Sequence, residues 1–282
     1  MEWFTSRRLT EHLTRITDIT GVYMYLVTGK EKALLIDTGC GLGDLAKYVQ
    51  GLTSLPLTVV CSHGHMDHAG GAAQFSKVYL NPKDVELSLE HCSEENRKEY
   101  AGICLRTLHP EIDPLEAESW VYQPVRREAY EPLLDKMKFE LGEMTVQAFA
   151  MKGHTKGCMC MLFMEERSIL LGDACNPSTF LFDKETVSVE EYQKSMQAFR
   201  HYEELYDTVW ISHGDGNSIP KEILAEGIRV CQEIMEGRDD KEEFCFMGGI
   251  YKAAHAMTPS QLRKDGGLAN IIYNDRHIWQ KQ

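Results

Sequence analysis

The chain has 282 residues, of which 43% are hydrophobic and 26% charged, so we expect a single globular domain over residues 1–282. Its sequence contains neither an apolar run long enough to span a bilayer nor a recognisable signal peptide, which predicts a cytoplasmic protein with no membrane partner. The net charge of −13 argues against nucleic acid as a partner, because phosphate backbones repel an acidic surface. The nine scattered cysteines are typical of reduced thiols.

The first part of the chain is typical of a layered α/β protein. Short apolar runs predict strands at Met24–Thr28, Ala33–Ile36, Leu57–Cys61 and Val78–Leu80. Gly29-Lys30 is a predicted hairpin turn between the first two. We expect one helix from about Asp44 to Val49 and a short one opened by Gly70-Gly71. Functional loops in such proteins follow the strand ends.

The pattern changes between Pro82 and about Tyr130. Strand signals stop there, and charged residues with helical spacing replace them. We predict a helical insertion at about 82–130 within the domain, because strand patterning resumes directly after it. We hypothesise that this insertion covers the active site and sets specificity. Its basic pair Arg126-Arg127 is interpreted as part of a solvated loop.

The second part of the chain repeats the strand-rich character. Strands are predicted at Phe139–Ala150, Cys158–Phe163, Ile169–Leu171 and Thr208–Ile211, with turns at Gly142-Glu143 and Glu165–Arg167. Ser188 and Glu191 form a capping-box pair before a helix from about Val189 to Leu205. A second helix is predicted at Pro220–Met235, and we expect a helical C-terminal segment.

A cluster of metal-ligand residue types follows the strand at Leu57–Cys61. His63, His65, Asp67 and His68 lie within six residues. Neutral imidazole and carboxylate are the usual ligands of zinc and similar divalent ions. In an extended loop the first two histidines point to the same side, whereas the adjacent Asp67 and His68 point differently and suit a second ion. The spacing therefore predicts a metal site at this strand end.

Three further residues of the same types each follow a predicted strand. They are His154 in Lys152–Thr155, Asp173 in Leu171–Asp173, and His213 in Ser212–Gly214. Each has a glycine beside it, which lets the backbone and a metal ion approach closely. We therefore add these three residues to the candidate ligands.

These motifs, taken together and in order, resemble those of the metallo-β-lactamase-fold hydrolases. The segments that carry the resemblance are Leu34–Gly39, His63–Gly71, Gly153–Thr155, Gly172-Asp173 and Ser212–Gly214. The resemblance covers roughly Gly21 to Gly216. It implies an αββα sandwich with the site at one edge. It also implies that His63, His65 and His154 bind one ion, that Asp67, His68 and His213 bind another, and that Asp173 bridges the two.

The identity of the ligands separates the branches of this family. β-Lactamases of the commonest class have Cys where Asp173 stands, and flavodiiron proteins have Glu where His65 stands. The set of five His and two Asp is most similar to the glyoxalase II and lactonase-like branch. The chain departs from the lactonases at Ala174–Pro177, which lacks the Tyr that they carry after the bridging Asp. Lys156 also replaces a Pro that is common after the Gly-His-Thr motif.

The function expected from these residues is that of a dinuclear metallohydrolase. Two divalent metal ions, with zinc expected and iron or manganese as alternatives, would share a hydroxide that attacks a small ester, thioester or lactone. Asp67 would position this nucleophile and move a proton to the leaving group. Asp37 would orient the metal loop through hydrogen bonds.

Two other reactions remain open at this stage. Iron-dependent persulfide dioxygenation uses much of the same motif with a single iron, and phosphodiester hydrolysis is the third alternative. We expect a small-molecule substrate, whose identity and binding residues the sequence leaves unknown, as it does the oligomeric state.

Overall fold

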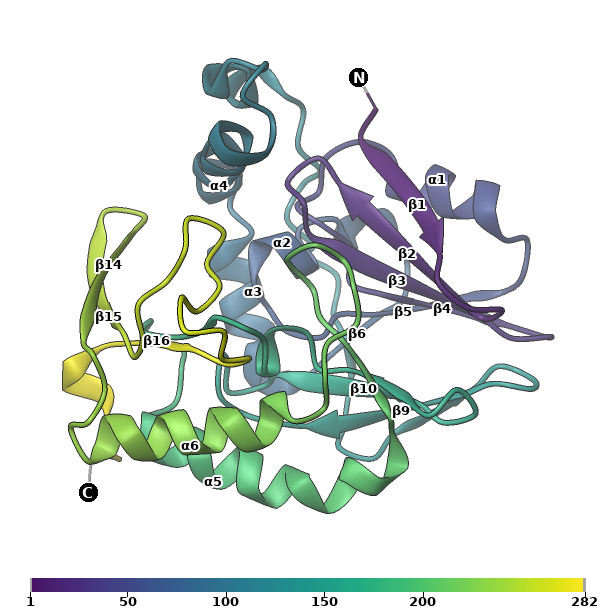
Figure 1. Cartoon of the computed structure of the whole chain (residues 1–282). Helices are drawn as coiled ribbons and strands as arrows, with labels where there is room; N and C mark the ends of the chain where they lie inside the picture. Colours follow the sequence, from purple (N-terminus) through teal and green to yellow (C-terminus); the bar gives the residue numbers. More distant parts are fainter. Residues whose placement is uncertain (1, 281–282) are drawn as a thin grey trace. The chain divides into compact units, whose positions relative to one another are not determined.

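The computed structural model describes residues 2–280 (Figure 1). The chain forms two compact units, Met1–Ala148 and Phe149–Gln282, which are described separately below. Both units mix helices with strands. The α/β class expected from the sequence is therefore confirmed, whereas the single domain over 1–282 stays a prediction.

A seven-stranded sheet with the order β1-β2-β3-β4-β5-β6-β7 forms the centre of the first unit. Its strands are β1 Phe4–Arg8, β2 Leu13–Asp18, β3 Tyr23–Thr28, β4 Ala33–Ile36, β5 Leu57–Val60, β6 Val78–Leu80 and β7 Glu131–Pro132. Strands β1 to β4 run antiparallel in sequence order, and β4 to β7 run parallel. A hairpin of β8 Lys138–Glu140 and β9 Thr145–Ala150 follows. Its turn at Gly142-Glu143, as predicted, has both residues at positive φ.

The helices of the first unit begin close to their predicted positions, with one exception. They are α1 Leu45–Leu52, α2 Met66–Ala69, α3 Val85–His91 and α4 Glu94–Leu108, with 3-10 turns η1 Ala72–Gln74, η2 Pro82–Asp84 and η3 Pro114–Ser119. The insertion is helical as expected. The short helix expected after Gly70-Gly71 was misplaced, because α2 begins at Met66 inside the histidine cluster and only the turn η1 follows the glycines.

A buried arginine fixes α4 to the rest of the first unit. The Arg97 side chain is 1% exposed. Its guanidinium donates to the backbone carbonyls of Cys40 at 3.4 Å, Gly70 at 3.3 Å and Gln123 at 2.7 Å. A buried charge is tolerated only when hydrogen bonds replace its water, and these carbonyls supply them. Arg97 therefore joins the turn after β4, the end of α2 and the end of the insertion.

Arg126 is buried in the same way, so the interpretation of Arg126-Arg127 as a solvated loop was wrong for its first residue. Its guanidinium donates to the carbonyls of Ala72, Phe75, Ser76 and Ala129. The side chain is 4% exposed. Backbone carbonyls satisfy this guanidinium in place of water, an arrangement that the charge of the residue alone does not reveal.

The second unit contains two groups of strands. In the first, β10 Met159–Phe163 pairs antiparallel with β11 Ser168–Leu170, which pairs parallel with β13 Thr208–Trp210. The second is a sheet with the order β12-β16-β15-β14, made of β12 Thr179–Leu181, β14 Glu242–Phe246, β15 Gly249–Ala253 and β16 Ile271–Tyr273. The helices are α5 Val189–Phe199 and α6 Ile223–Met235, with 3-10 turns η4 Gly172–Ala174, η5 Arg200–Leu205 and η6 Asp275–His277.

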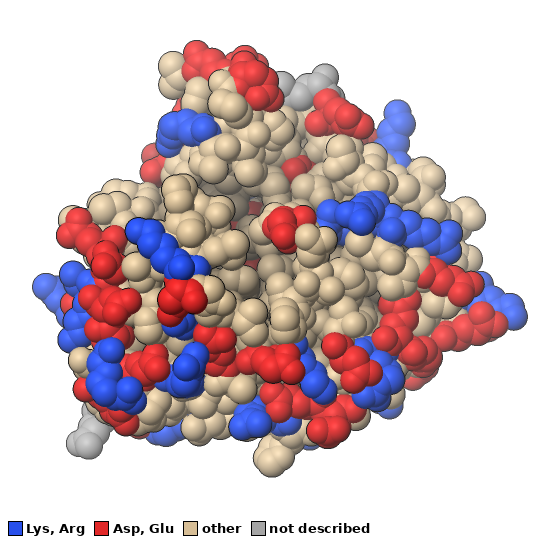
Figure 2. Space-filling view, viewed as in Figure 1, with Lys and Arg blue, Asp and Glu red and all other residues tan. Residues whose placement is uncertain are grey.

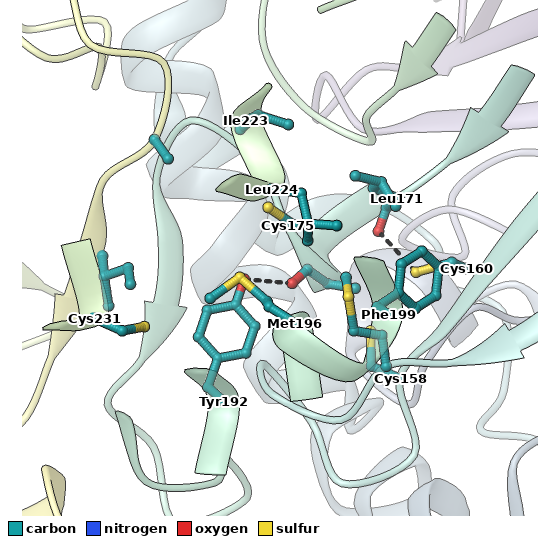
Figure 3. Close-up of a cluster of buried hydrophobic side chains, with 14 of the residues drawn as sticks. Cys158, Cys160, Leu171, Cys175, Tyr192, Met196, Phe199, Ile223, Leu224 and Cys231 are labelled. Carbon is teal, nitrogen blue, oxygen red and sulfur yellow. Dashed lines mark hydrogen bonds between the residues drawn. The ribbon is translucent and has the colours of Figure 1, made fainter. Parts of the chain in front are cut away.

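The core of the second unit packs around α5 and α6, which lie side by side (Figure 1). The start of α5 is capped as the sequence predicts, because the hydroxyl of Ser188 accepts the N–H of Glu191 at 3.2 Å. Figure 3 shows side chains from both helices meeting Cys158, Cys160 and Cys175 in this core. The chain's nine cysteines are all free thiols, as the sequence indicates.

After α6 ends at Met235, the described part of the C-terminal segment is helical only in the 3-10 turn η6. The expectation of a helical segment was wrong for 242–273, where β14, β15 and β16 form most of the second sheet. Strands β14 and β15 form a hairpin whose turn residues, Met247 and Gly248, both have positive φ. Met-Gly is a weak sequence signal for such a turn, since Asn or Asp normally occupies the first position.

Within residues 2–280, no helix combines the length and the apolar character needed to cross a bilayer. Acidic and basic side chains are interspersed on the face drawn in Figure 2. The negative net charge is therefore not gathered into one acidic patch on that face.

We predict that Arg97→Met lowers the free energy of unfolding by about 3 kcal/mol, because it leaves three buried carbonyls without their donor. Urea unfolding followed by circular dichroism measures this change. Arg106→Met is the matched control, since Arg106 lies exposed on the same helix and its loss should change stability by less than about 0.5 kcal/mol. Equal stability of the two variants would contradict the assigned role of Arg97.

Candidate metal centre

The candidate residues of the first unit lie where parallel strands end. Strand β4 pairs parallel with β5, and Ile36 stands opposite Val60. Asp37 and the loop that begins at Ser62 therefore leave the sheet at the same edge. Side chains at such an edge converge from segments far apart in the sequence, which is why open α/β sheets carry their sites there.

Asp37 is fully buried, and its carboxylate organises this loop. One oxygen accepts the N–H of Ser62 at 2.7 Å, and the other accepts the Ser62 hydroxyl at 2.9 Å and lies 2.9 Å from Nδ1 of His68. The backbone of Asp37 has φ of 68°, a left-handed conformation that Asp adopts more readily than most residues. This turn aims the carboxylate at both ends of the histidine cluster.

The four clustered candidates of the first unit lie close together. Nε2 of His63 is 3.1 Å from Nδ1 of His65, and Nε2 of His68 is 3.6 Å from Oδ2 of Asp67. The rings of His63 and His68 are 4.1 Å apart between centroids. Ligand atoms about 2.05 Å from a tetrahedral zinc ion are about 3.3 Å from one another. These separations therefore match the ligand spacing of such an ion.

The glycine between the first two histidines is required by close packing. The N–H of Gly64 donates to the Asp84 carboxylate at 3.1 Å. A Cβ atom at this position would lie 2.6 Å from the backbone oxygen of Asp84, which is closer than real contacts allow.

Tyr100, in α4 of the insertion, contacts a candidate ligand. Its hydroxyl donates to Oδ2 of Asp67 at 3.0 Å. Burial, and after it the charge of Asp67, raise the pKa of Tyr100 well above its ordinary value. The phenol therefore keeps its proton and acts as a donor that fixes the orientation of the carboxylate. The sequence analysis missed this residue, because no motif or spacing links it to the cluster.

His91 is a second contacting residue that no sequence motif singles out. It ends α3, and its ring stacks on that of His65 with 4.7 Å between centroids and 18° between planes. The contact holds the imidazole of His65 from the side of the insertion. Its only sequence signal is the residue type, since the two histidines lie 26 positions apart in the sequence.

Two of the three candidate residues of the second unit, Asp173 and His213, also lie after the ends of parallel strands. Strand β11 leads into Asp173, and its parallel neighbour β13 leads into His213. Nε2 of His213 is 3.2 Å from Oδ2 of Asp173, and Nε2 of His154 is 3.8 Å from the same oxygen. The second unit thus brings its three candidates together around one carboxylate.

Neighbouring groups hold these three residues in place. Nδ1 of His154 lies 2.9 Å from the carbonyl oxygen of Phe180, and the side chain of Asn176 donates to Oδ1 of Asp173 at 3.4 Å. The hydroxyl of Tyr192 donates to the carbonyl of Ala174 at 2.6 Å, which anchors the turn that carries Asp173 (Figure 3). Ordered neighbours of this kind fix the direction of a ligand side chain.

The donor chemistry of both groups fits divalent metal ions. His68 and His154 each direct Nδ1 at an oxygen acceptor, the Asp37 carboxylate and the Phe180 carbonyl, which favours a proton on Nδ1. Nδ1 of His63 lies 3.1 Å from the hydroxyl of Ser62, which itself donates to Asp37. These partners leave the Nε2 lone pair of each ring for a metal ion, the usual arrangement of metal-binding histidines.

Comparison with known families matches residues 17–209 to the metallo-beta-lactamase superfamily. The matched range contains six of the seven candidate ligands, and His213 follows it by four residues. Among curated proteins, the human acyl-coenzyme A thioesterase MBLAC2 is 24% identical over 193 residues, which are 61% of this chain and 67% of the human protein.

Two further comparisons agree with this family. The atrochrysone carboxyl ACP thioesterase of Aspergillus fumigatus is 25% identical over 195 residues, covering 66% of this chain and 48% of the fungal protein. Among solved structures, the metallo-beta-lactamase FIM-1 of Pseudomonas aeruginosa matches with a TM-score of 0.57 at 14% identity, over 82% of this chain and 96% of that one. The metallo-β-lactamase fold expected from the motifs is thereby confirmed, and the chain belongs to the metallo-beta-lactamase superfamily.

Proposed function

We propose that this protein is a metal-dependent hydrolase of acyl thioesters. The observation that carries the proposal is the orientation of three candidate ligands. His63, His68 and His154 each hold Nδ1 beside an oxygen and direct Nε2 toward another candidate ligand. Membership of the superfamily supports a hydrolytic reaction. Two relatives of the chain are thioesterases, which supports a thioester as the substrate. Asp173 at the position where common β-lactamases carry Cys argues against a β-lactam substrate.

In this proposal the seven candidates of the two units act together on two divalent ions, for which zinc suits the nitrogen-rich ligands. His63, His65 and His154 would hold one ion, Asp67, His68 and His213 would hold the other, and Asp173 would serve as a ligand shared by the two. Such ions, when bound, would lower the pKa of a water molecule and polarise the thioester carbonyl.

The protein's own residues then position and move the proton. Tyr100 holds Oδ2 of Asp67, so this carboxylate keeps one orientation while it accepts a proton from the attacking water. The water oxygen bonds to the acyl carbon, the carbon–sulfur bond breaks, and Asp67 gives the proton to the departing thiolate, which leaves as the thiol. Asp37 keeps His68 and, through Ser62, His63 in the tautomers whose Nε2 carries the lone pair that would bind a metal ion.

The direct test is hydrolysis of acyl-coenzyme A thioesters by the zinc-loaded protein. We expect release of coenzyme A, its loss after removal of metal with a chelator, and its return when zinc is added back. Coenzyme A should be measured by chromatography, because the protein's own free thiols, the exposed Cys245 among them, react with thiol reagents. One iron per chain with oxygen consumption on a persulfide, and no thioester turnover, would instead establish the oxidative alternative.

We predict that His65→Ala loses most bound metal and lowers kcat/KM for a thioester at least about 100-fold, because it removes a ligand at the centre of the site. Metal content by elemental analysis and turnover measure both effects. His201→Ala is the matched control, since His201 is exposed on η5 away from the candidate ligands of its unit. Full metal content with full turnover in His65→Ala would refute the assignment of this ligand.

Tyr100→Phe should keep the fold and weaken metal binding about 10-fold, because it removes only the hydroxyl that orients Asp67. Metal affinity by competition with a chelating dye distinguishes this effect from general damage. Tyr122→Phe removes a hydroxyl of the same insertion that donates instead to the carbonyl of Ala117. Equal metal affinities for the two variants would show that Tyr100 does not position Asp67.

A further inference from the structure

One face of the C-terminal sheet is formed by aromatic and other apolar side chains. In the β14–β15 register, Phe244 stands opposite Tyr251 and Phe246 opposite Gly249. Ala253 pairs with Ile272 in β16, and Ile272 pairs with Phe180 in β12. Because paired residues share a face, side chains from all four strands meet on one side of this sheet. We call it the aromatic face; its members are Phe180, Phe182, Phe244, Phe246, Tyr251, Ala253 and Ile272.

The rings of this face form one continuous layer. Phe180 lies 4.9 Å from Phe182, 5.6 Å from Phe244 and 5.3 Å from Phe246 between centroids. Phe182 stacks on Tyr251 at 3.9 Å and 17°. Aromatic layers of this kind offer broad apolar contact with little loss of side-chain freedom on binding.

The aromatic face is not the side on which the sheet meets its core. The alternate residues Leu181, Ile271 and Tyr273 point to the opposite side and belong to the core that also contains residues of α5 and α6. The aromatic face forms a separate small cluster, and the rings of Phe180, Phe244, Phe246 and Tyr251 are only half-buried. Half-exposed rings in contact with one another are typical of a surface that binds an apolar group.

One residue of the aromatic face, Phe180, contacts a proposed metal ligand. The carbonyl oxygen of Phe180 lies 2.9 Å from Nδ1 of His154, while the ring of the same residue joins the aromatic layer. One residue therefore connects a ligand to this layer. A substrate whose reacting carbonyl lies at the ligands could extend its apolar part along the rings without leaving the second unit.

We propose that the aromatic face binds the acyl chain of the substrate, so that the protein prefers thioesters with long apolar acyl groups. This inference rests on the proposed thioesterase function and adds the substrate class. Strands β14, β15 and β16 lie beyond residue 209, where the match to the superfamily ends. Five of the seven members of the aromatic face therefore lie outside the matched range, whereas Phe180 and Phe182 lie within it.

The test compares kcat/KM of the zinc-loaded protein for butanoyl-, octanoyl- and dodecanoyl-coenzyme A. A fully buried methylene raises kcat/KM about fourfold, so on this half-exposed face we expect a rise of at least about 10-fold from butanoyl to octanoyl. In Phe244→Ser and Phe246→Ser this ratio should fall below about threefold, because the chain then lies on a polar surface.

Cys245→Ser is the matched control for both variants. Cys245 lies between the two phenylalanines on β14, exposed on the opposite side of the sheet, so its replacement should leave the ratio unchanged. A second measurement is independent of turnover: calorimetric binding of a non-hydrolysable dodecyl thioether of coenzyme A to the metal-free protein. We expect Phe244→Ser and Phe246→Ser each to weaken this binding at least about fivefold relative to Cys245→Ser.

The possible results distinguish a failure of the acyl-binding role from a failure of the proposed thioesterase function. Hydrolysis of all three thioesters at equal kcat/KM, or a chain-length ratio that survives in both Phe variants, would overturn the acyl-binding role and leave thioester hydrolysis standing. Absence of thioester hydrolysis would overturn the proposed function itself. A change in oligomeric state in the Phe variants, with the chain-length ratio intact, would show that the face joins copies of the chain instead.

Discussion

A buried carboxylate at the end of β4 holds the candidate centre of the first unit in order. Asp37 fixes the start of the histidine loop through Ser62 and sets the tautomer of His68. Without such a partner, an imidazole can present either nitrogen and rotate about its side-chain bonds, so the sites of the metal ions would not be defined. In the second unit a backbone carbonyl has this role: that of Phe180 accepts from Nδ1 of His154 and fixes the tautomer of its ring. A short motif supplies ligand atoms, and the surrounding fold supplies their direction.

The spacing of His63, His65, Asp67 and His68 was enough to predict that they lie together, because neighbouring residues in a short loop have little freedom to separate. His154, Asp173 and His213 gained weight only from their positions at strand ends and from the family resemblance. Tyr100 and His91 could not be found in this way, since their contacts depend on how α3 and α4 pack over the loop. No periodic signal encodes such packing in one sequence.

The same distinction explains which elements of the fold were predicted. Strands β4 and β6 were placed correctly because they are apolar throughout or alternate cleanly. Strands β1 and β2 were missed, since charged and hydroxyl side chains interrupt their apolar residues; β1 is the edge strand of its sheet, and β2 is its neighbour. The β14–β15 hairpin was missed because its turn lacks a typical sequence and its aromatic residues lie among charged ones. Strands at the edge of a sheet, or next to it, are therefore the ones that sequence pattern reveals least.

Arg97 and Arg126 have a consequence for how this sequence can change. Their acceptors are backbone carbonyls, which every residue type provides. Exposed positions that supply these oxygens, such as Ser76 and Ala129, can therefore exchange their side chains without loosening the insertion. The two arginines themselves cannot be exchanged so freely, because lysine lacks the planar set of donors. A scaffold anchored in this manner lets the surface of the insertion diverge toward new substrates while its attachment to the histidine loop persists.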